Sequence, residues 1–158
     1  LKAGKCWLYE GGIRVPLVVK WPGKVAPNST STHAVTGPDH YPTLLNLTSL
    51  PKPALEQLDG RSYADTLLSK SQTARSPMFW HFKTQGHLAR VCGTPSGTVI
   101  NDGIYKLINW YDSGKIELYN VNKDIGESNN IAKTKPQVAK QLLRKLKTWQ
   151  NDMGIAIK

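Results

Sequence analysis

The stretch from Thr98 to Val121 reads TVINDGIYKLINWYDSGKIELYNV and contains three short β-type runs. The runs are separated by Asn101-Asp-Gly103 and Asp112-Ser-Gly114. Such triplets are typical of hairpin turns, because glycine adopts a positive φ easily and Asn or Asp tolerates it. In the last run, Ile116 and Leu118 fall on one face of the strand. The stretch therefore predicts an antiparallel meander.

The segments on either side of the meander extend this fold. The aromatic-rich run Met78–Phe82 predicts a further strand. Near the end of the chain, apolar residues at helical spacing define one stripe that must be buried, with Thr134 as the expected N-cap and Pro136 in the first turn. We expect an α+β subdomain, in which an antiparallel sheet of about four strands carries a C-terminal amphipathic helix. The residues of the stripe are Val138, Leu142, Leu143, Leu146, Trp149 and Met153.

The first half of the chain has a different pattern. The β-branched run Val15–Trp21 predicts a buried strand of an α/β sheet. A helix is expected to begin at Asp39 and to end near Ser49. A strand followed by a helix indicates the α/β edge of a larger sheet. We therefore expect residues 1–75 to be the end of an α/β domain and residues 76–158 to be the small subdomain.

The charge of the chain is strongly basic, with 21 Lys and Arg against 11 Asp and Glu. The excess is spread along the chain, since residues 1–75 carry nine basic and five acidic groups and residues 76–158 carry twelve and six. No RNA-binding signature accompanies the densest cluster, so a solvated helix face is favoured and no nucleic acid is expected. A basic module that binds sulfated glycans or nucleic acid stays open as an alternative. The cluster comprises Lys133, Lys135, Lys140, Arg144, Lys145 and Lys147.

Several function classes find no support in the sequence. The longest apolar run, Val15–Val19, is far shorter than the roughly 20 residues of a transmembrane helix, so no transmembrane segment is expected. The serine-hydrolase, dinucleotide and P-loop motifs are absent. The four histidines follow no metal-binding pattern. Cys6 and Cys92 lack metal or redox spacing, so two half-buried thiols are favoured, and a bridge between them stays open.

One lysine stands out from the spacing of its neighbours. Lys5 lies in the glycine-rich, aromatic-flanked loop Gly4–Trp7, which runs into the turn Glu10-Gly-Gly12. A lysine held rigidly in this way can meet an anion. From spacing alone, an ordinary solvated lysine remains the favoured interpretation.

A series of motifs resembles one known family. The run Gly4–Leu17, GKCWLYEGGIRVPL, and the following Trp21-Pro-Gly-Lys24 resemble the GKxxxYEGGxRxP and WPG signature of the type I sulfatases. This arylsulfatase family belongs to the alkaline-phosphatase-like superfamily, so the resemblance implies that the strand and helix of the first half belong to an alkaline-phosphatase-like sheet. Further segments resemble the family in family order: Asp39–Leu45, Leu58–Ser62, Phe79–His81, Asp102–Ile108 and Glu117–Val121.

The resemblance implies a sulfuric ester hydrolase. In that family, a formylglycine made from Cys or Ser in C/S-x-P-x-R is the nucleophile, and cations, with a calcium ion among them, neutralise the sulfuryl group. Neither Cys6 nor Cys92 fits that pattern, and the calcium ligands of the family would precede Leu1. We therefore expect a C-terminal portion with no metal ligands and no cofactor of its own. Calcium and formylglycine would come from a missing N-terminal catalytic part, and this chain alone is expected to be inactive.

The resemblance also assigns candidate site residues. Lys5 aligns with the sulfate-binding lysine of the family, which implies sulfate binding and charge stabilisation. Glu10 and Arg14 lie in the signature and are expected to form a buried structural pair. His81 is a candidate for substrate binding, because its strand lies beside the active site in relatives, although a structural histidine is favoured.

The loop between Thr84 and Thr94 provides two further candidates. His87 and Arg90 lie in it, and loops of this kind carry the variation that determines substrate specificity.

The substrate implied by the resemblance is a sulfate ester of a carbohydrate or of an aryl alcohol. The alternative from the same superfamily is a phosphoesterase or phosphonate hydrolase, which the nucleophile motif upstream would distinguish. The family's habit of export implies a periplasmic or secreted protein.

Overall fold

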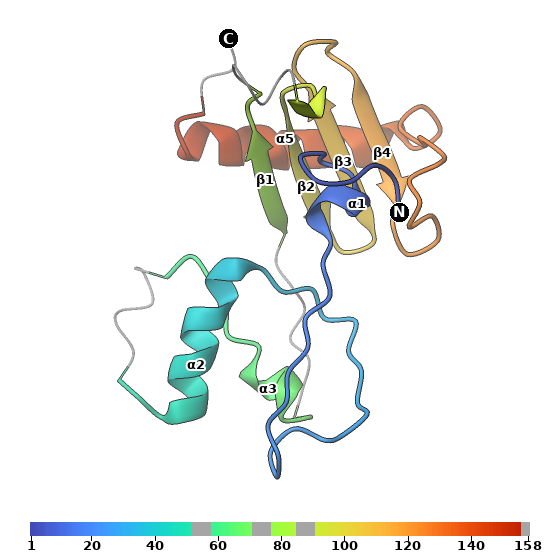
Figure 1. Cartoon of the computed structure of the whole chain (residues 1–158). Helices are drawn as coiled ribbons and strands as arrows, with labels where there is room; N and C mark the ends of the chain where they lie inside the picture. The colour runs from blue at the N-terminus through green and yellow to red at the C-terminus, as the bar shows by residue number, and fades with distance from the viewer. Residues whose placement is uncertain (52–57, 71–76, 85–90, 156–158) are drawn as a thin grey trace. The chain divides into compact units, whose positions relative to one another are not determined.

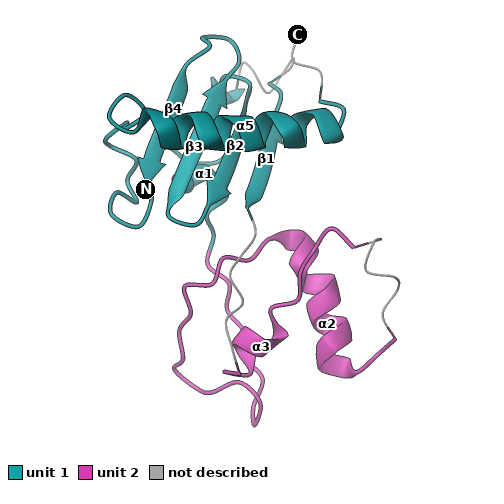
Figure 2. Cartoon of the chain, turned by 180° about the vertical axis from the view of Figure 1, so that it is seen from behind, with its two compact units in different colours: residues 1–15, 76–158 teal, residues 16–75 magenta. Residues whose placement is uncertain are grey.

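The computed structural model describes residues 1–51, 58–70, 77–84 and 91–155. The chain divides into two compact units, and Figure 2 distinguishes them by colour. Unit 1 combines residues 1–15 with residues 76–158, and unit 2 comprises residues 16–75. Each unit is described by itself.

Unit 1 is built on a four-stranded antiparallel sheet, β1-β2-β3-β4, in the order of the sequence. The register places Ile100 opposite both Phe79 and Leu107, and Leu107 in turn opposite Leu118, which makes one apolar row across the sheet. The predicted meander and the additional strand are confirmed. The strands are β1 Met78–Phe82, β2 Gly97–Asp102, β3 Tyr105–Trp110 and β4 Ile116–Asn120.

The long helix α5, Pro136–Asp152, covers one face of this sheet (Figure 1). Leu142 and Leu146 are buried against the apolar row of the strands. Full burial of a leucine side chain stabilises the folded state by about 1.5–3 kcal/mol relative to exposure. The buried stripe of α5 therefore stabilises the packing of the helix on this face of the sheet. The predicted helix on a sheet is confirmed.

The ends of α5 differ from the prediction. The N-cap is Lys135 rather than Thr134, because Pro136 is the first helical residue; the Thr134 hydroxyl donates to the carbonyl of Ile131 instead. Met153 follows the helix as its C-cap and is 62% exposed, so it does not belong to the buried stripe.

The other face of the sheet is covered by the first fifteen residues, which include the short helix α1, Glu10–Ile13. Leu8 and Tyr9 pack there against buried residues of β2, β3 and β4, such as Ile108. The views in Figures 1 and 2 place this segment and α5 on opposite sides of the sheet. The compact units therefore group residues 1–15 with the subdomain. The sequence predicted a different division, with residues 1–75 at the end of an α/β domain and residues 76–158 in the subdomain. That division concerns the domains of a longer protein, so it stays a prediction.

Unit 2 contains η1, Gly37–Asp39, α2, His40–Thr48, and α3, Ala64–Leu67. The buried carboxylate of Asp39 accepts hydrogen bonds from the backbone N–H of Thr36 at 2.7 Å and of Arg61 at 2.8 Å. It therefore joins the start of α2 to the segment before α3. The helix expected from Asp39 to Ser49 is confirmed.

The strand predicted at Val15–Trp21 is wrong for this structure. The segment has no regular secondary structure, and Val15 and Val18 are 80% and 88% exposed. A buried parallel strand needs a neighbouring strand to pair with, and none of the four described strands pairs with this segment. Its apolar side chains therefore face solvent.

Candidate functional site

Lys5 lies at the tip of a tight turn in unit 1. The backbone N–H of Trp7 donates to the carbonyl of Gly4 at 3.0 Å, which closes the turn around Lys5 and Cys6. Cys6 has a φ of 77°, as the third residue of a type II turn requires. The side chain of Lys5 is exposed. The turn therefore presents this ammonium group to solvent.

A disulfide joins Cys6 to Cys92, with their Cα atoms 6.1 Å apart. The favoured interpretation of two thiols was wrong, and the bridge that the sequence left open is present. The bond connects the turn of Lys5 to the segment that leads into β2. Because it closes a separation of 86 residues, it restricts the unfolded chain strongly.

The turn also rests on two glycines of the signature. The N–H of Gly11 donates to the carbonyl of Lys2 at 3.0 Å. A Cβ atom on Gly12 would collide with the carbonyls of Gly4 and Trp7. The Gly-Gly pair is therefore required by the close approach of two backbone segments, which holds the loop in place.

Beneath this loop lies a buried cluster of charges. The ammonium group of Lys106 lies 2.9 Å from Glu10 Oε1 and 2.9 Å from Glu127 Oε1, and the Lys106 side chain is fully buried. The backbone N–H of Glu10 donates to Glu127 Oε2 at 2.6 Å. Burial raises the pKa of Glu127, although the charge of Lys106 opposes that shift. One lysine thus joins α1 to β3 and to the turn after β4.

The expected pair of Glu10 and Arg14 has a different geometry. Arg14 Nη1 lies 3.4 Å from Glu10 Oε2, but the Arg14 side chain is 58% exposed. The buried partner of Glu10 is Lys106, which the sequence analysis missed. The alternation of β3 was a usable signal, since it places Lys106 on the same inward face as Ile108.

A third buried carboxylate, Glu117, anchors the aromatic part of the N-terminal segment. It accepts hydrogen bonds from the hydroxyls of Tyr9 at 2.8 Å and Tyr119 at 3.0 Å, and Lys115 Nζ lies 2.6 Å away. Burial acts to raise the pKa of Glu117, but these hydrogen bonds outweigh it and lower the pKa. Burial, together with Glu117, raises the pKa of both tyrosines. The Lys2 ammonium lies 4.0 Å from the centroid of the Tyr9 ring.

His81 lies elsewhere in unit 1. Like Phe79, it points to the face of the sheet that α5 covers, and its Nδ1 lies 3.0 Å from the hydroxyl of Tyr111. Gln150 of α5 donates to the same hydroxyl at 3.0 Å. Burial lowers the pKa of His81, and Lys83 lowers it further. Because the Lys5 loop covers the opposite face, the structure does not bring Lys5 and His81 together.

The remaining candidates, His87 and Arg90, lie outside the described residues. The roles assigned to them and to Lys5 and His81 stay predictions.

The described residues of this chain do not fit the metal and nucleophile of a sulfatase. Within the described ranges, no group of three or more His, Cys, Asp or Glu side chains could hold a metal ion. The two cysteines are bonded to each other. We therefore derive no step through calcium or formylglycine.

The helices of the described part of the chain include none that is long and apolar enough to cross a membrane.

Comparison with known proteins identifies the family. Residues 3–152 match the family described as N-sulphoglucosamine sulphohydrolase, C-terminal, and the chain belongs to this family of sulfatase C-terminal regions. The resemblance to the sulfatases is thereby confirmed.

Individual relatives agree with this assignment. A sulfatase of Formosa agariphila is 35% identical over 94% of this chain and 29% of its own length. An N-acetylgalactosamine-6-O-sulfatase of Bacteroides thetaiotaomicron is 30% identical over 89% of this chain and 28% of its own. A solved structure from work on the metabolism of multiple glycosaminoglycans by Bacteroides thetaiotaomicron is 26% identical, with a TM-score of 0.69 over 95% of this chain and 32% of that one. The chain spans less than one third of the length of each of these relatives.

The buried charge cluster predicts a large loss of stability when its cation is removed. Lys106→Met leaves Glu127 buried without a counter-charge and Glu10 with only the largely exposed Arg14 as a partner, which costs about 3–5 kcal/mol in free energy of unfolding. The matched control Lys123→Met removes an exposed lysine and should change the free energy of unfolding by about 0.5 kcal/mol or less. Urea unfolding at pH 7 measures both variants. Equal losses in the two proteins would contradict the role of the cluster.

The environment of His81 predicts a dependence of stability on pH. Because burial lowers its pKa in the folded state, the unfolded chain binds a proton more readily, and stability falls as the pH drops below about 6.5. His81→Gln removes this contribution. The urea midpoint of the parent chain is therefore expected to fall more between pH 7.5 and pH 5.5 than that of the variant. An identical fall would show that His81 makes no such contribution.

Proposed function

We propose that this chain is the C-terminal portion of a sulfatase that hydrolyses sulfate esters of carbohydrates. The family match over residues 3–152 is the observation that carries this proposal. The geometry of the Lys5 loop supports it, because the disulfide, the Gly-Gly pair and the buried charges all hold one exposed cation in place.

The role proposed for Lys5 is electrostatic. Charge develops on the oxygens of the sulfuryl group during transfer, and a cation fixed in advance stabilises that charge without reorganisation. Lysine suits this task as a compact point charge on a flexible side chain. The rigid backbone of the turn fixes the base of that side chain, and the exposed ammonium group remains free to meet the anion. In the full-length protein, calcium and formylglycine would supply the metal charge and the nucleophile from residues outside this chain.

The substrate class is proposed from the relatives. One relative is an N-acetylgalactosamine-6-O-sulfatase, and a similar solved structure comes from work on glycosaminoglycans, which favours sulfated carbohydrates over aryl sulfates. The family match also favours a sulfatase over the phosphoesterase or phosphonate hydrolase of the same superfamily.

We propose a periplasmic or secreted location for the protein. The bond between Cys6 and Cys92 supports this location, because disulfides persist in oxidising compartments and are rare in the cytosol.

The chain alone is expected to have no sulfatase activity, because its sequence contains no C/S-x-P-x-R motif and its described residues form no metal site. The purified 158-residue protein is incubated with 4-nitrophenyl sulfate, and the release of 4-nitrophenol is followed by absorbance. No release above the buffer blank is expected. Steady release that co-purifies with the chain would contradict this expectation.

In the full-length protein, Lys5→Ala is expected to lower kcat by about 10²–10³, since this is the usual effect of removing one charge-stabilising group. The matched control Lys24→Ala removes another exposed lysine and should leave turnover near normal. Unfolding of the 158-residue chain with the same substitution should be unchanged, because the side chain of Lys5 is exposed. Near-normal turnover of Lys5→Ala would show that Lys5 does not act at the sulfate site.

A further inference from the structure

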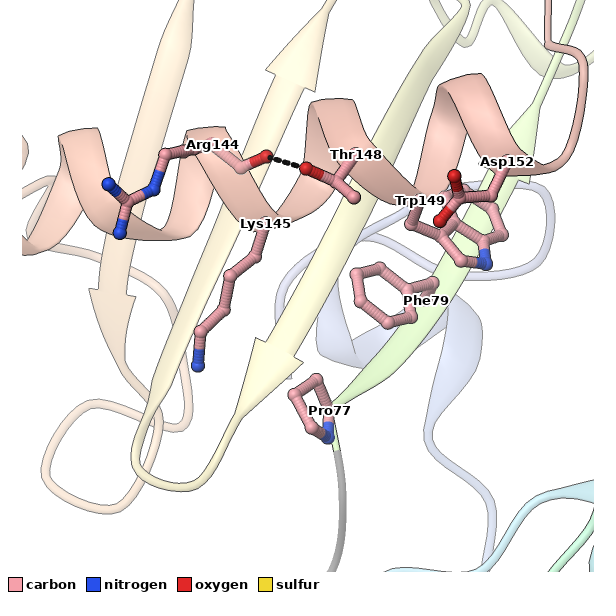
Figure 3. A pocket seen from close by; sticks show the side chains of 7 residues that line it. All are labelled: Pro77, Phe79, Arg144, Lys145, Thr148, Trp149 and Asp152. Carbon is pink, nitrogen blue, oxygen red and sulfur yellow. Dashed lines mark hydrogen bonds between the residues drawn. The ribbon is translucent and has the colours of Figure 1, made fainter.

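A cavity of about 420 Å³ lies where the second half of α5 crosses β1, as Figure 3 shows. It is formed by Phe79 and the preceding Pro77, and by Arg144, Lys145, Trp149 and Asp152 of α5. These residues lie on the face of the sheet that α5 covers, so the cavity is separate from the Lys5 loop.

The wall of the cavity is aromatic. Phe79 and Trp149 stack with their ring centroids 4.9 Å apart and an angle of 7° between the planes. Both side chains are half-buried, so part of each ring reaches the cavity. Rigid aromatic groups with a few polar neighbours are typical of small-molecule sites, and aromatic rings offer a large apolar surface at a low entropic cost.

Two cations of α5, Arg144 and Lys145, also line the cavity. Lys145 Nζ lies 2.6 Å from Asp102 Oδ2, and its side chain is 42% exposed. Arg144 is exposed, and its guanidinium has no hydrogen bond or ion pair with the described residues. The planar donors of an arginine match the oxygens of a tetrahedral or planar anion.

The surrounding helix surface adds to this charge. Lys140 precedes Arg144 by four residues and Lys147 follows it by three, so both lie on the same side of α5, and both are exposed. An anion at the cavity therefore enters a basic surface.

One acidic group gives the cavity a further property. Asp152 lines it near the aromatic wall. A carboxylate accepts hydrogen bonds from hydroxyl groups but repels a row of phosphates. A ligand that combines an apolar ring face, hydroxyl groups and an anionic substituent fits this set of residues, whereas a nucleic acid strand fits it less well.

We propose that this cavity binds a sulfated saccharide at a second site, remote from the Lys5 loop. The choice of sulfate as the anionic substituent rests on the proposed function. A sugar ring packs against Phe79 and Trp149, Arg144 and Lys145 hold the sulfate, and Asp152 accepts from hydroxyl groups. A sulfated polysaccharide that is bound here keeps its other sugar units at a high effective concentration near the same protein.

The test uses the 158-residue chain and a sulfated heparin hexasaccharide, with binding followed by calorimetry at two salt concentrations. We expect binding that weakens as salt rises, and at least tenfold weaker binding of the desulfated hexasaccharide and of a single-stranded DNA 12-mer. The double variant Arg144→Gln, Lys145→Gln should bind the sulfated probe at least tenfold more weakly. The matched control Lys133→Gln, Lys135→Gln removes two exposed charges from the segment just before α5 and should change the affinity less than threefold.

Three results would overturn the proposal: no binding of the sulfated probe, equal losses in the two double variants, or DNA binding as tight as that of the hexasaccharide. Both substituted pairs are exposed, and circular dichroism checks that the variants fold.

A further arm separates this proposal from the proposed function. In the full-length protein, the variant at Arg144 and Lys145 should hydrolyse 4-nitrophenyl sulfate at the normal rate. A full-length protein that binds the hexasaccharide at this cavity but hydrolyses no sulfate ester would contradict the proposed function alone. A protein that hydrolyses the ester but does not bind at the cavity would contradict this inference alone.

Discussion

The buried contact of Lys106 with Glu10 and Glu127 is the constraint on which the rest of unit 1 depends. A charge that is buried without a partner is costly, so the three groups must stay together once the sheet has formed. The helix α1 has only four residues, which is far too short to be stable by itself. Its position is therefore determined by the sheet beneath it, and the loop of Lys5 follows from that position.

This arrangement explains why distant segments of the sequence carry the family's motifs. The Tyr-Glu-Gly-Gly turn, the lysine of β3 and the glutamate of β4 are far apart in the chain, yet they meet on one face of the sheet. The glycines allow close backbone contact, and the carboxylates accept from the lysine and the tyrosines. Lys5 is exposed in this assembly, so the packing does not determine its identity. Its role at the sulfate is the one proposed above.

Local patterns in the sequence predicted the elements of unit 1 well. The Asn-Asp-Gly and Asp-Ser-Gly turns located the meander, and the stripe that includes Leu142 and Leu146 located α5 on it. Contacts between distant residues were harder to predict. The Cys6–Cys92 bond and the burial of Lys106 depend on the tertiary arrangement, which no short stretch of the sequence specifies. The Val15–Trp21 run failed for a related reason, because strand propensity is realised only where a neighbouring strand supplies hydrogen bonds. The expected N-cap at Thr134 failed because Pro136 itself begins the helix.

The composition of unit 1 from two separate segments has a consequence for how the protein reaches its native state. The hairpins of β2, β3 and β4 join neighbours in the sequence, so they need only short loops to close. When residues 1–15 dock on the sheet, they close a long loop formed by residues 16–75. The chain loses the conformational entropy of this loop before the buried ion pairs form. We therefore expect the meander and α5 to form first and the N-terminal segment to dock last. Once the bond between Cys6 and Cys92 has formed, it closes this long loop covalently, so in the oxidised protein the segment that carries Lys5 cannot move far from the sheet.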